Sequence, residues 1–374
     1  MTQKPETIVR NFNQLVKIAN QFQPDAQITD IQQYGSGNIN STFLVTLDLQ
    51  PPFILQRINT VVFCQPELVM DNICILSDYV HQQLQHYNFP AGRRWLMPRV
   101  FFTPQNKNHY VAEDGTFWRG ISFIDNSQSF DTIQSLQHAR EIGYGLGMFH
   151  SLLHHLPIDR LADTLEGFHI TPGYLKHYEQ VKQRVEITPS PEVDYCFQTI
   201  ADRPQLPYVL ETAKAAGKLN LRTIHGDPKI NNIMIDCSTQ EAVAIIDLDT
   251  VKPGLIHYDI GDCLRSSCNF LGEETSDWQQ VKFEPELARA ILKGYLEVAK
   301  DFLTKDDYQY IYDSIRLLAF ELGLRFFTDY LEGNVYFNAK HAEHNLARAL
   351  VQFKLTQSIE SQSDTINQII TEMI

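Results

Sequence analysis

The sequence lacks the features that mark exported and membrane proteins. No run approaches the roughly 18 uninterrupted apolar residues that a membrane-spanning helix needs. The first residues, MTQKPETIVRNFNQL, contain no apolar core of the signal-peptide type. Six cysteines are scattered along the chain, and the closest pair, Cys263 and Cys268, does not have the spacing of a zinc site. We therefore expect reduced thiols in a cytoplasmic protein that contacts no membrane.

Basic residues are also scarce. The 374 residues include 31 Lys and Arg against 45 Asp and Glu, which gives a formal net charge of −14. Such a chain has no net basic field to attract nucleic acid or an anionic membrane, so neither is an expected partner. With 43% apolar and 20% charged residues, the composition is that of a folded globular protein. The length suggests a two-lobed unit or two to three domains.

The first third of the sequence alternates in the manner of β-strands. Five strand-like runs are found, at 27–34, 41–48, 53–59, 109–113 and 116–124. Asp114-Gly115 between the last two runs is a hairpin signal. Helical spacing is found at 6–22 and 67–87. These patterns predict a five-stranded antiparallel sheet with helices over residues 1–124.

After the polar stretch 125–131, helical patterns dominate. They cover 132–154, 173–186, 206–217, 284–300, 305–331 and 340–358. A β-rich island interrupts them between Leu221 and Thr250. A β-rich small lobe over 1–124 followed by a mainly helical large lobe over 125–374 predicts an α+β, two-lobed fold with a ligand bound between the lobes.

The strongest chemical signal is the segment HGDPKINN at 225–232, followed by an apolar strand and then by IIDLDT at 245–250. Phosphoryl transfer needs one carboxylate to orient the acceptor hydroxyl and take its proton. It also needs an amide oxygen and a second carboxylate to hold Mg²⁺ against the triphosphate. Asp227 is therefore predicted as the catalytic base, and Asn232 and Asp247 as the metal ligands. His225 is expected to brace the loop, and Asp249 to be either a further metal ligand or a loop anchor.

A second signal is the glycine turn YGSGN at 34–38, which lies between two predicted strands. Glycines there let backbone N–H groups approach anionic oxygens. An ordinary hairpin turn is the alternative, but the position upstream of HGDPKINN favours phosphate binding. We therefore predict nucleotide contacts at Gly35, Ser36, Gly37 and Asn40.

The order of glycine turn, polar hinge, HGDPKINN and IIDLDT resembles the aminoglycoside phosphotransferase/choline kinase-like superfamily, which shares the protein-kinase fold. A closer resemblance is to the N-acetylhexosamine 1-kinase group, in the strings FILQRINTVVF, PELVMDNI, FWRGISFIDNS, HGDPKINNIMID, IIDLDTVKPG and ELGLRFFTDYLEGNVYF. This resemblance implies an ATP- and Mg²⁺-dependent kinase that phosphorylates the anomeric hydroxyl of N-acetylglucosamine or N-acetylgalactosamine. It further implies sugar contacts at Arg325 and Tyr336, and an adenine-holding hinge at Phe123 and Ile124.

One strand departs from the wider kinase pattern. A lysine there normally reaches the α- and β-phosphates, whereas FILQRIN places Gln56 at this position with Arg57 beside it. Strand alternation sends the two side chains to opposite faces, and a glutamine cannot replace a cation. Either Arg57 is redirected, or Mg²⁺ and backbone N–H groups carry the phosphate charge beside Gln56. In the second case nucleotide affinity depends strongly on Mg²⁺.

Arg325 lies in the very apolar segment LLAFELGLRFFTDYL, where a buried charge needs a partner or a ligand. The alternative to sugar contact is an ion pair with Glu321, one helical turn earlier. Tyr336 follows Gly333 in a loop, where an exposed aromatic ring more often serves recognition than packing.

Three functions fit the sequence. The first is the sugar kinase. The second is a kinase of the same fold acting on choline, an aminoglycoside, homoserine or methylthioribose. Its cationic acceptors would need clustered carboxylates or an aromatic cage, for which Trp278, Tyr295 and Tyr312 are candidates that spacing does not bring together. The third is a non-catalytic nucleotide-binding pseudokinase, against which the complete set Asp227, Asn232 and Asp247 argues. The preferred hexosamine and the oligomeric state stay open.

Overall fold

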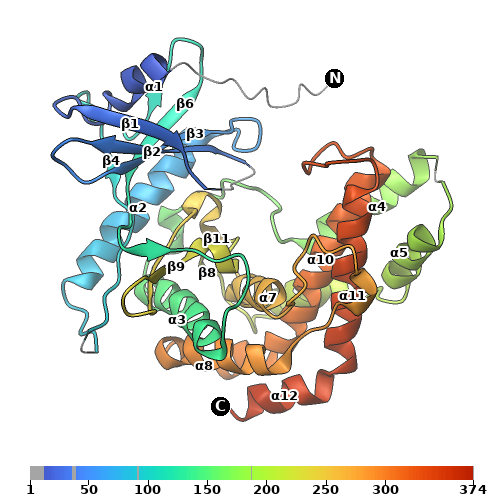
Figure 1. Cartoon of the computed structure of the whole chain (residues 1–374). Helices are drawn as coiled ribbons and strands as arrows, with labels where there is room; N and C mark the ends of the chain where they lie inside the picture. The colour runs from blue at the N-terminus through green and yellow to red at the C-terminus, as the bar shows by residue number, and fades with distance from the viewer. Residues whose placement is uncertain (1–11, 36–38, 91, 187, 374) are drawn as a thin grey trace.

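The computed structural model describes residues 12–35, 39–90, 92–186 and 188–373, and it has the two lobes that the sequence predicts (Figure 1). The small lobe contains an antiparallel sheet, and the large lobe is mainly helical. Among these described residues, no helix is both long and apolar enough to span a membrane.

The small lobe is built on one antiparallel sheet with six strands. They are β1 (Ile28–Gln33), β2 (Ser41–Leu47), β3 (Phe53–Ile58), β4 (Val100–Phe101), β5 (Tyr110–Val111) and β6 (Phe117–Ser122). The order is β1-β2-β3-β6-β4, and β5 also pairs with β6. The predicted number of five strands is wrong, because the two-residue β4 is too short to leave a periodic pattern. The predicted hairpin is confirmed, with Gly115 at a φ of 80° between β5 and β6.

Each face of this sheet packs against one helix. Phe53, Leu55 and Trp118 share a core with the buried residues of α1 (Phe12–Ala19). On the opposite face, Ile58 and Phe117 belong to the core that includes the buried residues of α2 (Pro66–Leu84). The sheet therefore lies between the two helices that the sequence predicts at 6–22 and 67–87. Residues 6–11 lie outside the described part of the chain.

The large lobe is formed by ten α-helices within the described residues. They are α3 (Leu136–Leu153), α4 (Thr171–Arg184), α5 (Pro191–Ala201), α6 (Val209–Ala215), α7 (Ile256–Ser267), α8 (Pro285–Ala299), α9 (Lys305–Gln309), α10 (Ile311–Leu331), α11 (His344–Ser361) and α12 (Ser363–Thr371). The helical patterns of the sequence match all of these except α5, α7 and α12. Sequence reasoning missed α7, although its apolar residues Ile256, Ile260, Cys263 and Leu264 have helical spacing; in the fold almost all of its residues are buried, including charged ones.

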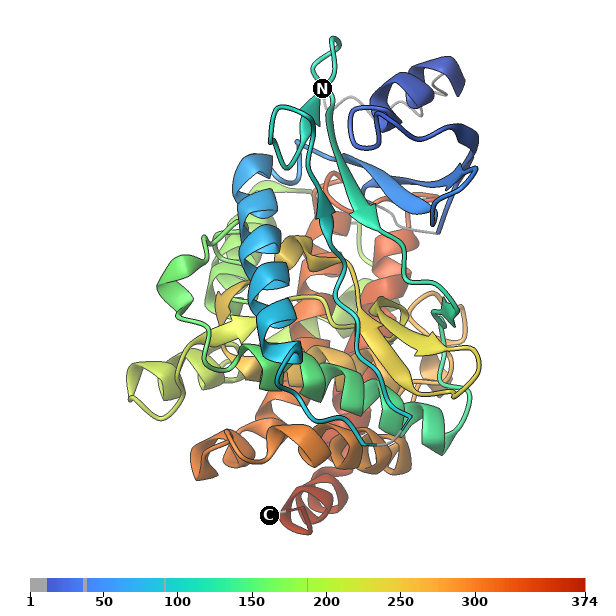
Figure 2. The ribbon, with the colours of Figure 1, turned by 90° about the vertical axis from the view of Figure 1, so that its left-hand side faces the viewer.

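Four short strands of the large lobe carry the loops of the β-rich island. They are β8 (Arg222–Ile224), β9 (Ile233–Asp236), β10 (Ala242–Ile245) and β11 (Lys252–Gly254). β9 pairs with β10 and with β7 (Ser127–Gln128), while β11 pairs with β8. Figure 2 shows these strands between the small lobe and helices α3 and α8. The HGDPKINN loop joins β8 to β9, and the IIDLDT segment follows β10, so both loops lie where the lobes meet.

Candidate active site

The HGDPKINN loop has a conformation that its own residues enforce. Gly226 adopts a φ of 86°, and a Cβ atom there would lie 2.7 Å from the Thr250 backbone oxygen, so only glycine fits. His225 is fully buried, its Nε2 donates to the Ile246 oxygen at 2.9 Å, and its Nδ1 accepts from the Asp227 N–H at 3.3 Å. Burial lowers the pKa of His225 below its ordinary value. His225 therefore braces the loop as a neutral ring, as predicted.

Asp259 of α7 holds the backbone of the same loop from below. Its Oδ2 accepts from the His225 N–H at 2.6 Å and from His150 Nε2 at 2.9 Å, and its Oδ1 accepts from the Gly226 N–H at 2.8 Å. Burial alone would raise the pKa of Asp259, but the donors, led by His150, lower it below its ordinary value. Sequence reasoning missed Asp259. Its only signal is a charge in the segment IHYDIGDCL, which needs partners once buried.

Asp227, the predicted base, stands next to a lysine of its own motif. Lys229 Nζ lies 2.9 Å from Asp227 Oδ2, and the two side chains are 40% and 30% exposed. Desolvation by the surrounding protein raises the pKa of Asp227 above its ordinary value, and the positive charge of Lys229 opposes this rise. A carboxylate that is partly open and held by one cation can accept the proton of a hydroxyl group. Lys229 itself was not predicted as a site residue, although the motif contains it.

Asn232 and Asp247 meet where β9 begins and β10 ends. The Ile246 N–H donates to the Asn232 backbone oxygen at 2.8 Å. Asn232 Nδ2 donates to the Asp227 backbone oxygen at 2.8 Å, which leaves its Oδ1 as an acceptor. Asp247 has a φ of 63° and a ψ of 56°, a left-handed conformation that turns it out of the strand direction.

The exposure of Asp247 and the negative charges near it suit a residue that binds a cation. Asp247 is an exposed residue. Desolvation of the carboxylate by the surrounding protein is the largest cause that raises the pKa of Asp247, which reaches about 7. The negative charges of Asp249 and Asp227 contribute to this rise. No group of three or more His, Cys, Asp or Glu in the described residues could hold a metal alone. One carboxylate and one amide oxygen fit Mg²⁺, which takes few protein ligands and completes its shell with phosphate and water oxygens.

Asp249 is engaged as a loop anchor, one of the two roles that the sequence left open. One carboxylate oxygen forms an ion pair with Arg119 of β6, and the other accepts from Asn40 Nδ2 at 2.6 Å. Gln56 Oε1 in turn accepts from Arg119 Nε at 2.9 Å and from Nη2 at 2.7 Å. Arg119 lies opposite Gln56 in the sheet register, whereas Arg57 lies opposite Trp118 on the other face. A redirected Arg57 is therefore excluded, and the cation beside Gln56 is Arg119, which sequence reasoning missed.

The predicted nucleotide side is only partly within the described residues. Ser36 and Gly37 lie outside them, while Gly35 adopts a φ of 74° at the end of β1. Asn40 Oδ1 accepts from the Asn59 N–H at 2.9 Å, so both ends of the Asn40 amide are engaged within the protein. The glycine turn is thus tied at its base to the large lobe through Asp249.

The predicted hinge offers an apolar surface beside this turn. The ring of Phe123 meets the ring of Tyr34 edge-on, at 5.8 Å between centroids. Ile124 is buried in a small cluster with Met234 and Val243 of the neighbouring strands. This surface has the apolar character that an adenine ring needs, so the hinge at Phe123 and Ile124 stays a prediction that the geometry allows.

The acceptor side begins at His169, which joins the catalytic loop to α10. His169 Nε2 lies 2.7 Å from the Gly226 oxygen, and its Nδ1 lies 2.8 Å from Glu321 Oε1. Both partners are acceptors, so both ring nitrogens carry protons. Burial alone would lower the pKa of His169, but the Glu321 carboxylate raises it above its ordinary value. Thr171 Oγ1 donates to the second Glu321 oxygen at 2.6 Å. No sequence pattern pointed to His169.

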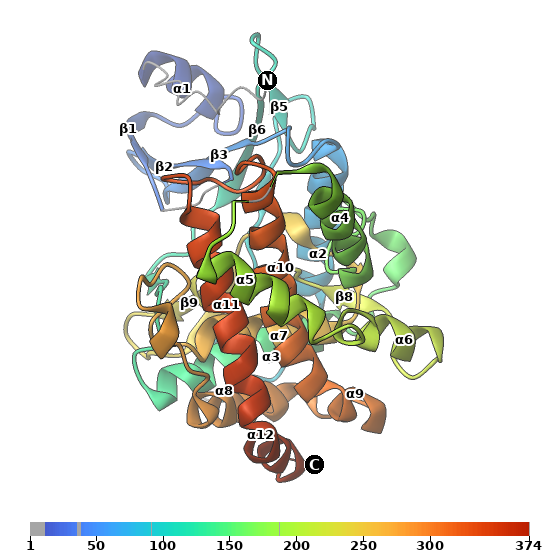
Figure 3. The ribbon, with the colours of Figure 1, turned by 90° about the vertical axis from the view of Figure 1, so that its right-hand side faces the viewer.

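Arg325 and Tyr336, the two predicted sugar contacts, come together at the end of α10. The Arg325 guanidinium carbon lies 5.9 Å from the Tyr336 ring centroid, and it also faces the rings of Phe168, Tyr174 and Phe337. Figure 3 shows this end of α10, and the loop that leads to α11, next to the small lobe. Tyr336 is 65% exposed. The alternative pair of Arg325 with Glu321 does not form, because His169 and Thr171 hold that carboxylate.

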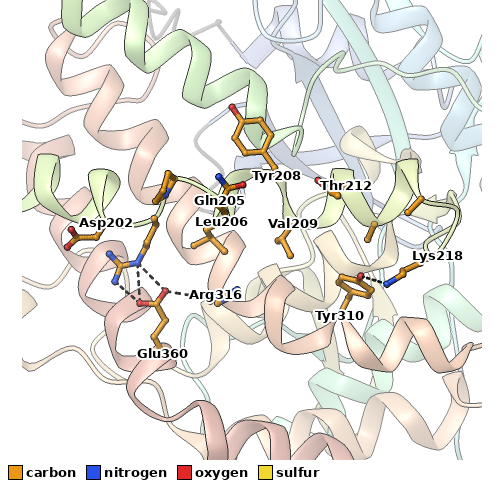
Figure 4. Close-up of a pocket in the computed structure, with 14 residues that line it drawn as sticks. Asp202, Gln205, Leu206, Tyr208, Val209, Thr212, Lys218, Tyr310, Arg316 and Glu360 are labelled. Carbon is orange, nitrogen blue, oxygen red and sulfur yellow. Dashed lines mark hydrogen bonds and ion pairs between the residues drawn. The ribbon is translucent and has the colours of Figure 1, made fainter.

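A separate surface hollow of about 700 Å³ lies away from these loops, between the α5–α6 segment and helices α10 and α11. Figure 4 shows that Arg316 lies beside Glu360 and that Lys218 reaches the Tyr310 hydroxyl. Arg203 also forms an ion pair with Glu360. Each of these cations has a partner within the protein. We therefore assign no function to this hollow.

Fold and site together define a small-molecule phosphotransferase of the kinase-like, two-lobed type. The model of the phosphotransferase enzyme family known as APH matches residues 30–304, and the chain belongs to that family.

Solved structures with this fold have low sequence identity to the chain. An aminoglycoside phosphotransferase from Alicyclobacillus acidocaldarius is 14% identical, with a TM-score of 0.59 over 100% of this chain and 96% of that one. The amicoumacin kinase hAmiN, in complex with AMP-PNP, Ca²⁺ and its ligand Ami, is 16% identical, with a TM-score of 0.57 over 95% and 94%. A choline kinase from Cryptosporidium parvum is also 16% identical, with a TM-score of 0.56 over 91% of each chain.

Proposed function

We propose that the protein is an ATP-dependent kinase that phosphorylates the anomeric hydroxyl of an N-acetylhexosamine. The observation that carries this proposal is the charge balance on the acceptor side. Three carboxylates there each have a cation of their own: Asp227 with Lys229, Asp262 with Arg265, and Glu321 with His169. Arg325 is left over as a further positive charge. A neutral acceptor suits this surface better than a cationic one.

The aromatic residues of this side lead to the same preference. The Arg325 guanidinium lies among four aromatic rings, those of Phe168, Tyr174, Tyr336 and Phe337. Because Arg325 already occupies the position between these rings, a choline-like cation could not bind there. The rings named as cage candidates in the sequence are separate. Trp278 contacts Tyr195, Tyr295 contacts His150, and Tyr312 lies under Arg316.

Hydrogen-bonding groups of both kinds remain for a sugar. The Arg325 guanidinium makes no ion pair within the described chain and offers N–H donors. Asp262 Oδ2 is a buried acceptor without a hydrogen-bond partner among the described residues, and the Asp262 charge acts on the pKa of both Asp227 and Arg325. Hydroxyl and acetamide groups supply the complementary acceptors and donors.

In the proposed reaction Asp227 orients the acceptor hydroxyl and takes its proton. An anomeric hydroxyl is more acidic than an ordinary alcohol, so a carboxylate is a sufficient base. The positive charge of Lys229 lowers the pKa of Asp227, and Asp259 holds the loop on which both stand. Asn232 and Asp247 would hold Mg²⁺, which when bound neutralises charge on the phosphates.

The test is ADP release with a panel of acceptors. N-acetylglucosamine, N-acetylgalactosamine, choline, an aminoglycoside, homoserine and methylthioribose are compared, and phosphorus NMR identifies the phosphorylated hydroxyl. We expect kcat/KM for an N-acetylhexosamine to exceed that for every cationic acceptor by at least about 100-fold, with a sugar 1-phosphate as product. Preference for a cationic acceptor would refute the proposal.

A variant links this preference to the site. Arg325→Met should raise the KM for the sugar by about tenfold or more while the KM for Mg·ATP stays near the wild-type value. Arg316→Met, a change of a partly exposed arginine on the same helix, is the matched control and should leave both constants unchanged. An unchanged sugar KM in Arg325→Met would remove that residue from the site.

A further inference from the structure

A buried ion pair joins the sheet of the small lobe to the loop that carries Asp247. Arg119 of β6 and Asp249 are each only 2% exposed, and Asp249 follows Asp247 by two residues in the chain. An ion pair that is excluded from water and bonded on all sides holds its elements at a defined separation. The pair therefore spans the junction of the two lobes at the metal-ligand loop.

Each end of this ion pair is held by further hydrogen bonds. On the sheet, Gln56 of β3 accepts two hydrogen bonds from Arg119 of β6 and donates one to Thr42 Oγ1 of β2 at 2.9 Å. These hydrogen-bonded side chains therefore connect three neighbouring strands. On the loop, Asp249 also binds Asn40, which precedes β2 and follows the glycine turn. One carboxylate thus fixes both the sheet and the base of the turn.

Helix α2 does not provide a charge for this cation. From α2, Met70 contacts the Arg119 guanidinium, with 4.0 Å between Nη1 and Sδ. The helix is itself bound to the large lobe, since Asn72 Nδ2 donates to the oxygens of Ala162 at 2.9 Å and Val251 at 3.0 Å. In the wider kinase pattern a strand lysine pairs with a helix glutamate. Here the cation of the sheet pairs with the metal-ligand loop.

We propose that Arg119 and Asp249 are positioning residues that hold the small-lobe sheet and Asp247 at the separation a Mg·nucleotide requires. This inference rests on the proposed kinase function. Arg119 is not assigned as a phosphate ligand, because Nε and Nη2 bind Gln56 and Nη1 binds Asp249. The ion pair is formed in the absence of nucleotide, so nucleotide binding does not have to pay the free-energy cost of bringing the two lobes to their correct separation.

Removing one partner and removing both have different consequences, which separates positioning from simple packing. A single neutralising change leaves an uncompensated buried charge and is strongly destabilising, whereas loss of both charges together is often tolerated. The double variant Arg119→Met/Asp249→Asn should therefore recover most of the stability that Arg119→Met loses. It should not recover the positioning, because the link between sheet and loop is gone.

The experiment measures four quantities: the unfolding midpoint without nucleotide, the Kd of Mg·ADP by calorimetry, kcat and the acceptor KM. We expect the double variant to have a midpoint close to that of the wild type, a Kd for Mg·ADP raised at least tenfold, a reduced kcat and an acceptor KM within about twofold. Arg316→Met/Asp313→Asn removes a partly exposed ion pair within α10 and is the matched control. It should leave all four quantities unchanged.

Two outcomes would overturn the inference, and they are distinguishable. A double variant that binds Mg·ADP as tightly as the wild type would show that the pair only packs the lobe junction, with the kinase function intact. A wild-type protein that does not bind Mg·ADP would refute the proposed function and this inference with it. Where the methionine variants do not fold, Arg119→Lys keeps the charge but cannot bind Gln56 and Asp249 together, so its Kd for Mg·ADP should still exceed that of the wild type.

Discussion

Replacing Asp259 by Asn should damage both the fold and the reaction, although Asp259 touches no substrate in this account. The carboxylate accepts three hydrogen bonds, two from backbone N–H groups of the catalytic loop and one from His150. An asparagine has one acceptor oxygen, so its NH₂ group must face at least one of these donors.

The cost follows from what is lost. At least one charge-assisted bond disappears, at roughly 1.5–3 kcal/mol, and one buried N–H loses its partner, at roughly 1–3 kcal/mol. The free energy of unfolding should therefore fall by about 2.5–6 kcal/mol. The loop would also shift, and a displacement near 1 Å at a reacting group costs on the order of 100-fold in rate.

Urea titration followed by intrinsic fluorescence measures the first effect, and ADP release by the folded variant measures the second. Asp48→Asn is the matched control, because Asp48 is exposed and follows β2, and its substitution should cost less than about 0.5 kcal/mol. If Asp259→Asn lost less than about 1 kcal/mol and kept its kcat, the loop would not depend on this carboxylate and the reasoning would be refuted.

Two further predictions concern titrating groups of the site. The folded-state pKa of His169 is raised, so its contribution to stability is complete below the unfolded pKa and is lost as pH rises through the folded pKa. The difference in unfolding free energy between wild type and His169→Gln should therefore shrink from pH 6 to pH 9, and a difference that grows with pH would contradict the assignment. Lys229 lowers the pKa of Asp227, so Lys229→Met should move the acid limb of the kcat/KM profile to higher pH and reduce kcat at neutral pH. An acid limb that does not move would separate Lys229 from the base.

Local patterns predicted the parts of this molecule that local residues determine. The alternating runs at β1, β2, β3 and β6 and the turn at Asp114-Gly115 are where the sequence placed them. The HGDPKINN loop adopts the conformation that its glycine implies, with a φ of 86°. The resemblance also brought Arg325 and Tyr336 into one neighbourhood, which the contact of 5.9 Å supports.

The parts that escaped prediction depend on contacts between distant residues. Arg119 and Asp249 are separated by 130 positions, and neither has a periodic pattern that links it to the other. Asp259 lies on the polar side of α7, which is also buried, and the helical spacing of α7 does not indicate which groups this carboxylate binds. His169 acts from a loop, where neither helical nor strand periodicity applies. For such residues the useful sequence feature is a charged residue in an apolar segment. It indicates that the charge has a partner in the fold, but not which residue that partner is.

The most direct test of the account is the turnover of Asp227→Asn with an N-acetylhexosamine and Mg·ATP, followed by ADP release. We expect this variant to keep the wild-type fold and to bind Mg·ATP, but to lose kcat by at least about two to four orders of magnitude, because the group that takes the hydroxyl proton is gone. A variant that turned over the sugar at a near-normal kcat would contradict the assignment of Asp227 as the base, and with it the proposed reaction.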